Sequence, residues 1–599
     1  MFLVTTSDQR FWKKDEKIFF LGEWCRTFDQ EQVWSKLDHQ VLSHHWEDRD
    51  RYYQDFLYLD DVYERYLERL SEIMNVFHGV EHSTRYWRLV IGPWLYYFIQ
   101  TLYDKYLSIR TAIDSGKIKK TWIPSLEPGE YIPQDFATFQ EWQSGDSYNQ
   151  YFYGVIIKAL GGISYETKNK ASQLDQTDLR FRLRPGNWTG PQGHFGIGLA
   201  CKTIIKKCLE SYARIIPKNW NKVVFVSSYL KHWDLFWLQL SLGQLPSPVY
   251  PWPITSKVLP NIGLRQKIKL PLGQNEFESL LQEMIPLQIP TVYVEEYVGM
   301  NQRARAEFPR WPKVIFTCNA HFSNEGFKFW VANQVERGVK LVGMQHGGHY
   351  GSALWSSNET HEIRVADKYY TWGWEDENQP KMVPVASGKL DGTKEKIKVD
   401  CHGGILWIGM SRPRYANWMF SAPVGPQMLE YINDQKSFWE ALFPEAKDLL
   451  TLRLFPADFG WGIKEGLRER LPGLRFDNQK KTMYQQLCKS RLCIGTYNST
   501  TNLETLSANF PTIAFWNFDH WKLRESARPY FDDMVRSGIF HTSPASAAVK
   551  VNEIYKDPLS WWNSSSIQEA RDRFCMRFAR TSETWRLEWK SDLQRLINE

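Results

Sequence analysis

Residues 345–351, with the sequence QHGGHYG, bring two imidazoles and three glycines into one short segment. Imidazoles exchange protons near neutral pH and bind phosphate or metal, and glycine lets backbone amides approach an anion closely. Zinc needs a third and a fourth ligand, and neither is evident. We interpret the segment as a loop that lines a ligand cleft, with a structural turn and a metal site as the alternatives. The residues assigned to it are Gln345, His346, Gly347, Gly348, His349 and Tyr350.

Residues 495–504, GTYNSTTNLE, read as the end of a strand, a turn and the start of a helix. Ser499 or Thr500 at the N-cap satisfies backbone amides, and Glu504 comes close to a capping-box position. The same helix start offers amide donors and a positive dipole end to a phosphate. We predict that Ser499, Thr500 and Glu504 bind a phosphate group of a ligand; an ordinary capped helix is the alternative.

Both segments follow short apolar runs that predict buried strands. The runs VIFTCNA (314–320) and VKLVGMQHG (339–347) enclose a helical pattern at 324–338, and a similar series restarts with ILWIGMS at 405–411. Alternating strands and helices indicate a parallel sheet with helices on both faces. Ligands of such sheets lie at the carboxyl ends of strands, where both segments are expected.

A polar, glycine-bearing stretch at 387–403 separates the two series. We therefore predict an α/β protein with two doubly wound, Rossmann-like domains that face a cleft. The first domain, 1–395, carries a large helical insertion. The second domain spans 396–560, and the C-terminal helices of 561–599 pack back on the first. Residues 163–196 read as a long loop.

The segment IGTYNSTTNLETLSANFPTIAF resembles the nucleotide-binding end of GT-B glycosyltransferases, in the manner of sialyltransferases and Kdo transferases. FLGEWCR, HSTRYWRLVIGPWL and MQHGGHYG are similar to a family of transferases from bacterial O-antigen and surface-polysaccharide loci. The resemblance implies a GT-B-like fold, with the acceptor on the first domain and the nucleotide-sugar donor on the second. It also implies a CMP-activated donor whose phosphate is held by Ser499 and Thr500. Where sialyltransferases have a His-Pro pair this chain has Phe455 and Pro456, which puts CMP in doubt.

Transfer from a nucleotide sugar needs a group that stabilises the leaving phosphate and, for inversion, a base for the acceptor hydroxyl. The cations considered for the phosphate are Arg412, Arg414 and Arg453. The residues considered for catalysis are Glu23, His82, His321 and His346. The literal Asp48-Arg49-Asp50 lacks the preceding buried strand of a metal-binding DxD, so we expect neither metal nor cofactor.

The composition narrows the class of protein. Lys and Arg number 74 against 68 Asp and Glu, a balance too even for a nucleic-acid-binding protein. The 8 cysteines lack zinc or disulfide spacing, and we expect neither a signal peptide nor a membrane span. The 28 tryptophans suit packing and sugar stacking. We expect a cytoplasmic protein, and a peripheral membrane contact stays open.

Together these readings predict a metal-independent glycosyltransferase. The expected donor is a nucleotide sugar, with a CMP-activated Kdo- or nonulosonate-type sugar favoured, and the expected acceptor is a glycan or lipid-linked glycan of a surface polysaccharide or O-antigen. The alternatives are a phosphopolyol transferase of the teichoic-acid type and a non-catalytic scaffold or carbohydrate-binding protein of polysaccharide assembly.

Overall fold

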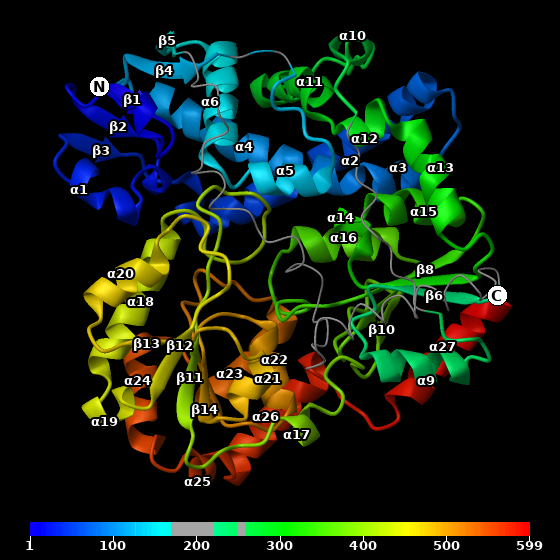
Figure 1. The fold of residues 1–599 in the computed structure, drawn as a ribbon, viewed down its shortest axis with the longest axis vertical. Helices are drawn as coiled ribbons and strands as arrows, with labels where there is room; N and C mark the ends of the chain where they lie inside the picture. The colour runs from blue at the N-terminus through cyan, green and yellow to red at the C-terminus, as the bar shows by residue number, and fades with distance from the viewer. Residues whose placement is uncertain (126, 128, 169–219, 248–257) are drawn as a thin grey trace, which may run out of the picture.

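The computed structural model describes the chain except for residues 126, 128, 169–219 and 248–257. Within the described part, every named strand pairs in parallel with its neighbours, in three separate sheets (Figure 1). The doubly wound α/β class predicted from the sequence is confirmed. The number of sheets is corrected from two to three, because the expected first domain holds two of them. Most of the expected loop at 163–196 lies outside the described residues.

The first sheet has the order β3-β2-β1-β4-β5. Its strands are Phe2–Val4 (β1), Ile18–Phe20 (β2), His39–Val41 (β3), Lys120–Pro124 (β4) and Ser164–Lys168 (β5). The predicted helical insertion lies between β3 and β4 and is dominated by the long helices Arg49–His78 (α2) and Gly92–Asp114 (α4). The central strand β1 is buried throughout, as expected for a strand covered on both faces.

The second sheet has the order β10-β9-β8-β7-β6. Its strands are Val223–Val226 (β6), Val314–Thr317 (β7), Lys340–Met344 (β8), Lys368–Thr371 (β9) and Met382–Pro384 (β10). Its helices include His232–Ser241 (α9), Glu325–Val335 (α15) and Ser357–Val365 (α16). The register Val342↔Phe316 aligns β8 with β7, so their carboxyl ends lie at the same edge.

The third sheet has the order β13-β12-β11-β14-β15-β16. Its strands are Gly404–Ile408 (β11), Leu450–Arg453 (β12), Arg475–Phe476 (β13), Ser490–Gly495 (β14), Thr512–Phe515 (β15) and Phe540–His541 (β16). Helix α22, Thr500–Ser507, follows β14 directly. The chain passes from β10 to β11 through the polar stretch 387–403.

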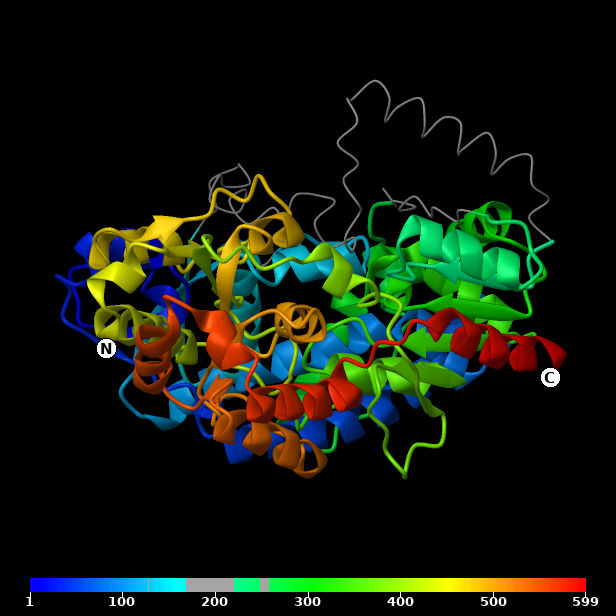
Figure 2. The same cartoon turned by 90° about the horizontal axis from the view of Figure 1, so that it is seen from below.

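The C-terminal helices connect the third sheet to the second (Figures 1 and 2). Helix Ser565–Phe578 (α26) packs beside helix Arg528–Arg536 (α23) of the third sheet, and helix Trp585–Asn598 (α27) packs on β7. Asp592 of α27 accepts hydrogen bonds of 2.7 Å each from Lys368 and Tyr370 of β9. Among the described helices, none combines the length and apolar composition that a membrane crossing requires.

Candidate functional site

The loop after β8 is anchored by Gln345. This side chain is buried, and its Oε1 accepts from the backbone N–H of Trp372 (2.8 Å) and from Nε1 of Trp374 (2.6 Å). An amide buried in this way must be bonded on all sides, and these bonds fix where the following residues begin. Gln345 therefore positions the loop.

His346 pairs with a buried carboxylate that the sequence analysis missed. Its Nε2 lies 3.1 Å from Oε1 of Glu362 on α16, and the hydroxyls of Tyr350 (2.8 Å) and Tyr369 (2.7 Å) donate to the same carboxylate. Burial raises the pKa of Glu362, while His346 and the tyrosine donors act in the opposite direction. An imidazole whose Nε2–H is held by a carboxylate presents Nδ1 as a proton acceptor. No hydrogen bond to Nδ1 of His346 occurs among the described residues.

His349 has a different environment. Its Nε2 lies 3.1 Å from Oγ of Ser356, and its ring stacks on Phe420, which follows β11 of the third sheet, with centroids 5.0 Å apart. Burial, together with the nearby charges of His346 and Arg412, lowers the pKa of His349 to about 3. His349 is therefore neutral near pH 7 and serves as a hydrogen-bonding and packing group.

The two segments selected from the sequence meet in space. A Cβ added to Gly348 would lie 2.2 Å from the carbonyl carbon of Ser499 and 2.6 Å from the amide nitrogen of Thr500, so only glycine allows this approach. The Asn498 side chain donates to Oγ of Ser352 at 3.0 Å. The loop after β8 and the start of α22 thus form one assembly built from two sheets.

The start of α22 is capped as predicted. Ser499 is the N-cap, and its hydroxyl accepts from the amide of Asn502 at 3.4 Å. Glu504, one turn further along, lies 4.0 Å from Nζ of Lys389, which reaches toward the carbonyl of His346 at 3.5 Å. Burial raises the pKa of Glu504, and the nearby Lys389 ammonium opposes this shift. Lys389 links both segments, and no sequence pattern singles it out because it lies in the polar stretch.

Arg412 brings a positive charge to this assembly. Its guanidinium lies 4.2 Å from the ring centroid of Phe420, the ring on which His349 stacks. Its Nε is buried without a hydrogen-bond partner, and Arg412 has no ion pair among the described residues. Burial lowers the pKa of Arg412 to about 10, which leaves it charged near pH 7. A buried cation without a counter-ion is costly, and an anionic ligand would supply the missing charge.

The other predicted cations are already paired. Arg414 is 3.0 Å from Asp146 of the first sheet's domain and also donates to the carbonyl of Trp24, at 2.5 Å. Arg453 is ion-paired with Asp477. Both guanidinium groups therefore hold the fold together and leave Arg412 as the cation that faces the assembly unpaired.

Three of the predicted bases lie apart from the assembly or are inaccessible. Glu23 is ion-paired with Arg26 next to the first sheet. His82 stacks on Tyr86 with centroids 3.6 Å apart and lies 3.4 Å from a Glu336 oxygen. His321 is 1 % exposed, and burial lowers its pKa to about 3. Of the four residues considered for catalysis, His346 is the one that lies in the assembly.

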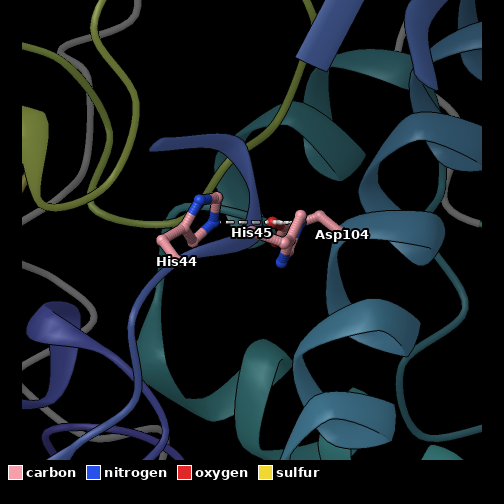
Figure 3. Close-up of side chains that lie close together, drawn as sticks. All are labelled: His44, His45 and Asp104. Atoms are coloured by element: carbon pink, nitrogen blue, oxygen red, sulfur yellow. Dashed lines mark hydrogen bonds and ion pairs between the residues drawn. The ribbon is translucent and has the colours of Figure 1, made fainter. Parts of the chain in front are cut away.

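The described residues with metal-ligating side chains close together are His44, His45 and Asp104 (Figure 3). The three side chains are buried, and Oδ1 of Asp104 lies 3.0 Å from Nε2 of His44 and 3.3 Å from Nε2 of His45. Nδ1 of His44 accepts from the backbone N–H of Trp46 at 3.2 Å. A backbone amide can only donate, so the neutral His44 ring carries its hydrogen on Nε2 and donates it to Asp104.

A metal ion bound to Nε2 of His44 would force the ring hydrogen onto Nδ1. The backbone N–H of Trp46 would then face the Nδ1–H group, a second donor, in place of an acceptor. The arrangement therefore fits a hydrogen-bonded cluster better than a metal centre. Burial and the adjacent His44 lower the pKa of His45 to about 4, so this ring stays neutral too. The cluster packs the β3–α2 connection against α4 and lies outside the assembly around His346.

Comparison with known proteins gives a family. A family model described as LIC12162 family transferase matches residues 1–593. A comparison with curated protein sequences finds no match.

Several solved structures share parts of the architecture at low similarity. The wall teichoic acid polymerase TagF matches at 10 % identity and a TM-score of 0.28, over 50 % of this chain and 84 % of that one. UDP-GlcNAc 2-epimerase from Neisseria meningitidis matches at 11 % identity and 0.31, over 59 % and 96 %. WaaG, a glycosyltransferase involved in lipopolysaccharide biosynthesis, matches at 11 % identity and 0.25, over 51 % and 95 %. At these identities and TM-scores, the matches say nothing about the substrate of this chain.

Proposed function

The chain belongs to the LIC12162 family of transferases, and on that basis we propose that it is a glycosyltransferase that needs no metal ion. Its donor is a nucleotide sugar, and its acceptor is a glycan or lipid-linked glycan of a surface polysaccharide. The observation that carries the proposal is the contact of Gly348 with the Ser499–Thr500 peptide. This contact brings a base, a helix N-terminus and an unpaired guanidinium into one assembly.

The phosphate of the donor is assigned to the start of α22 and to Arg412. The helix start supplies the amides of Thr500 and Thr501 and the Ser499 hydroxyl, which together favour an anion. Arg412 supplies a full positive charge with a planar fork that suits phosphate or carboxylate equally. A CMP-activated acidic sugar, which carries both groups, is the donor that we favour.

The acceptor is assigned to His346. In the proposed step Nδ1 of His346 takes the proton of the acceptor hydroxyl while the hydroxyl oxygen forms a bond to the anomeric carbon. The bond from that carbon to the donor phosphate breaks, and the phosphate keeps the electron pair. Glu362, 3.1 Å from Nε2, stabilises the imidazolium that results. The negative charge of the leaving phosphate develops beside Arg412 and α22.

Calorimetry with a panel of CMP, UDP, GDP and CDP-glycerol, in buffer with excess EDTA, tests the proposal. We expect one nucleoside phosphate to bind with micromolar affinity, and the same affinity with added magnesium. CDP-glycerol binding in preference to the others would favour phosphopolyol transfer. If none of these nucleotides binds, the proposed donor site at α22 is wrong, and a non-catalytic scaffold protein is favoured.

A further inference from the structure

The most exposed tryptophans of the described chain lie on segments that adjoin the neighbouring strands β6 and β7 of the second sheet. They are Trp220 (65 % exposed), Trp233 (63 %), Trp237 (53 %) and Trp311 (65 %). Most of the other described tryptophans are buried in the core. Large apolar side chains left in water are informative only when they cluster, and these come from segments that the fold joins.

Side-chain and backbone hydrogen bonds hold those segments together. Gln244, after α9, bonds both backbone groups of Val223 (3.1 and 2.8 Å), and Asn221 donates to the carbonyl of Leu245 at 3.0 Å. The carbonyl of Lys222 accepts from the amide of Lys313 at 2.8 Å. Trp220 and Trp311 each stand two residues before one of these lysines, so both lie at the amino ends of adjacent strands β6 and β7.

Helix α9 continues the surface. Trp233, Trp237 and Leu240 have the i, i+4, i+7 spacing of one helix face, and all three are exposed. Leu238, on the other side of the helix, is fully buried. A helix at an aqueous surface normally places polar residues on its outer face, whereas α9 has two tryptophans and a leucine there.

Cations border these aromatic residues. Lys222, Lys313 and Arg337 are exposed and have no ion pair among the described residues. The Arg337 guanidinium lies 5.6 Å from the ring centroid of Trp311. The exposed Glu336 beside them already accepts from Ser83, and Asp234 is half-buried on α9. The net charge of this border is positive.

We propose that this surface docks the protein onto an anionic lipid bilayer. We call it the tryptophan face; its residues are Trp220, Lys222, Trp233, Trp237, Leu240, Trp311, Lys313 and Arg337. Tryptophan is enriched at the headgroup level of bilayers because its ring is amphipathic, and neighbouring Lys and Arg are attracted to anionic lipid. A sugar or a protein partner would account for the exposed tryptophan rings but not for the unpaired cations beside them. The combination favours lipid.

Trp311 and Lys313 of the tryptophan face lie toward the opposite end of the second sheet from the loop that holds His346. The amide of Lys340, at the start of β8, donates to the carbonyl of Lys313 at 3.1 Å, and β8 ends at Met344 just before the loop. Five residues of strand span roughly 16 Å. The docking proposal stands independently of the proposed reaction, because it uses none of the side chains assigned to that reaction.

Co-sedimentation of the full chain with vesicles tests the proposal. Vesicles of phosphatidylcholine with phosphatidylglycerol at a 7:3 ratio should bind the parent protein, and vesicles of phosphatidylcholine alone should bind it at least tenfold more weakly. The double variant Trp233→Gln/Trp237→Gln should lose at least tenfold in vesicle affinity, because both rings leave the headgroup region. Lys222→Gln/Lys313→Gln should lose several-fold, and 0.5 M salt should reproduce that loss in the parent.

The matched control is Val549→Gln/Leu587→Gln, which removes two exposed apolar side chains elsewhere, 66 % and 63 % exposed. It should bind vesicles as the parent does. The proposal would be overturned if the Trp233/Trp237 variant bound vesicles as tightly as the parent. It would also be overturned if the parent bound vesicles equally well with and without phosphatidylglycerol. A parent dimer that the same variant converts to monomer would also overturn it, in favour of a contact between copies. Nucleotide affinity, measured on the same variants, should not change.

Discussion

Gly348 lies against the peptide that joins Ser499 to Thr500, and this contact couples the loop after β8 to the start of α22. Gly348 follows strand β8 of the second sheet, whereas Ser499 and Thr500 follow strand β14 of the third sheet, far away in the sequence. Around the contact lie the His346–Glu362 pair on one side and the capped helix start on the other. The relationship implies that the loop and the helix act as one site.

Gly348→Ala tests the contact directly. The added methyl group has backbone atoms of residues 499 and 500 in its way, at 2.2 to 2.6 Å, so loop and helix must separate. We expect a loss of stability of about 1–3 kcal/mol and a much larger loss of nucleotide affinity and turnover. Gly347→Ala is the control, since its Cβ would meet only the side chains of Tyr350 and His349 at 3.0 Å or more. Equal effects of the two variants on turnover would contradict the role of the contact.

Ser499→Ala tests the donor phosphate site. Loss of the cap should cost about 0.5–2 kcal/mol of stability, and loss of a hydrogen bond to a charged phosphate should weaken nucleotide binding by about 1.5–3 kcal/mol. Ser543 caps helix Pro544–Ile554 (α24) in the same way, by accepting from the amide of Ser546 at 3.2 Å. Ser543→Ala should therefore show the stability loss alone. Calorimetry and thermal unfolding on both variants separate the two effects.

The two arginines near β11 show how far the sequence could predict the site. Arg412 and Arg414 share one segment and looked equivalent. In the structure Arg414 meets Asp146, which is 268 positions away in the chain, whereas Arg412 meets aromatic rings and no acid among the described residues. A partner so distant leaves no local pattern in the sequence. Glu362 was missed for the same reason, since within SNETHEIRV it resembles any surface glutamate.

The fold was predictable where strands were long and apolar. The strands β8, β11 and β14 have five or six residues, and each was read from the sequence in nearly the right place. In the first sheet β1, β2 and β3 have three residues each, and β3 is only half-buried. The apolar runs at 2–6 and 17–24 do predict β1 and β2, but strands this short carry little periodic signal, so the sequence does not show that they form a sheet separate from the second. The sequence between strands β3 and β4 of this sheet is dominated by the long helices α2 and α4.

Turnover should respond to His346 and Glu362 as a pair. His346→Ala removes the proposed base and should lower kcat by roughly 10²- to 10⁴-fold, with nucleotide affinity largely unchanged. Glu362→Gln keeps the shape but cannot stabilise the imidazolium, and it should also lower kcat. Because the groups act together, the double variant should be little worse than His346→Ala. His402→Ala, at an exposed position, should match the parent in kcat. Parent-like kcat in His346→Ala would falsify the assignment of the base.

Stability should fall as the pH drops below about 6.5. Burial lowers the pKa of His45 to about 4 and that of His321 to about 3, against about 6.5 in the unfolded chain. The folded state therefore binds fewer protons than the unfolded state between these values. Each histidine contributes stability that is complete above pH 6.5 and is lost at about 1.4 kcal/mol per pH unit on acidification. Unfolding midpoints at pH 7.5, 6.0 and 5.0 measure the effect, and His321→Asn should reduce the pH dependence by about one proton.

Arg412→Met separates ligand binding from folding. The guanidinium lies among Phe420 and Trp418, its Nε is buried without a partner, and it has no ion pair among the described residues. Replacing an unpaired, partly buried charge with an apolar side chain of similar length removes a desolvation cost, so thermal stability should stay level or rise. Nucleotide affinity should fall by about tenfold or more, because the cation assigned to the phosphate is gone. Arg453→Met is the matched control. It breaks the ion pair with Asp477 and should lose stability while keeping affinity. If Arg412→Met destabilises the protein as Arg453→Met does and binds nucleotide as the parent does, then Arg412 is a structural residue and the phosphate site must be sought elsewhere.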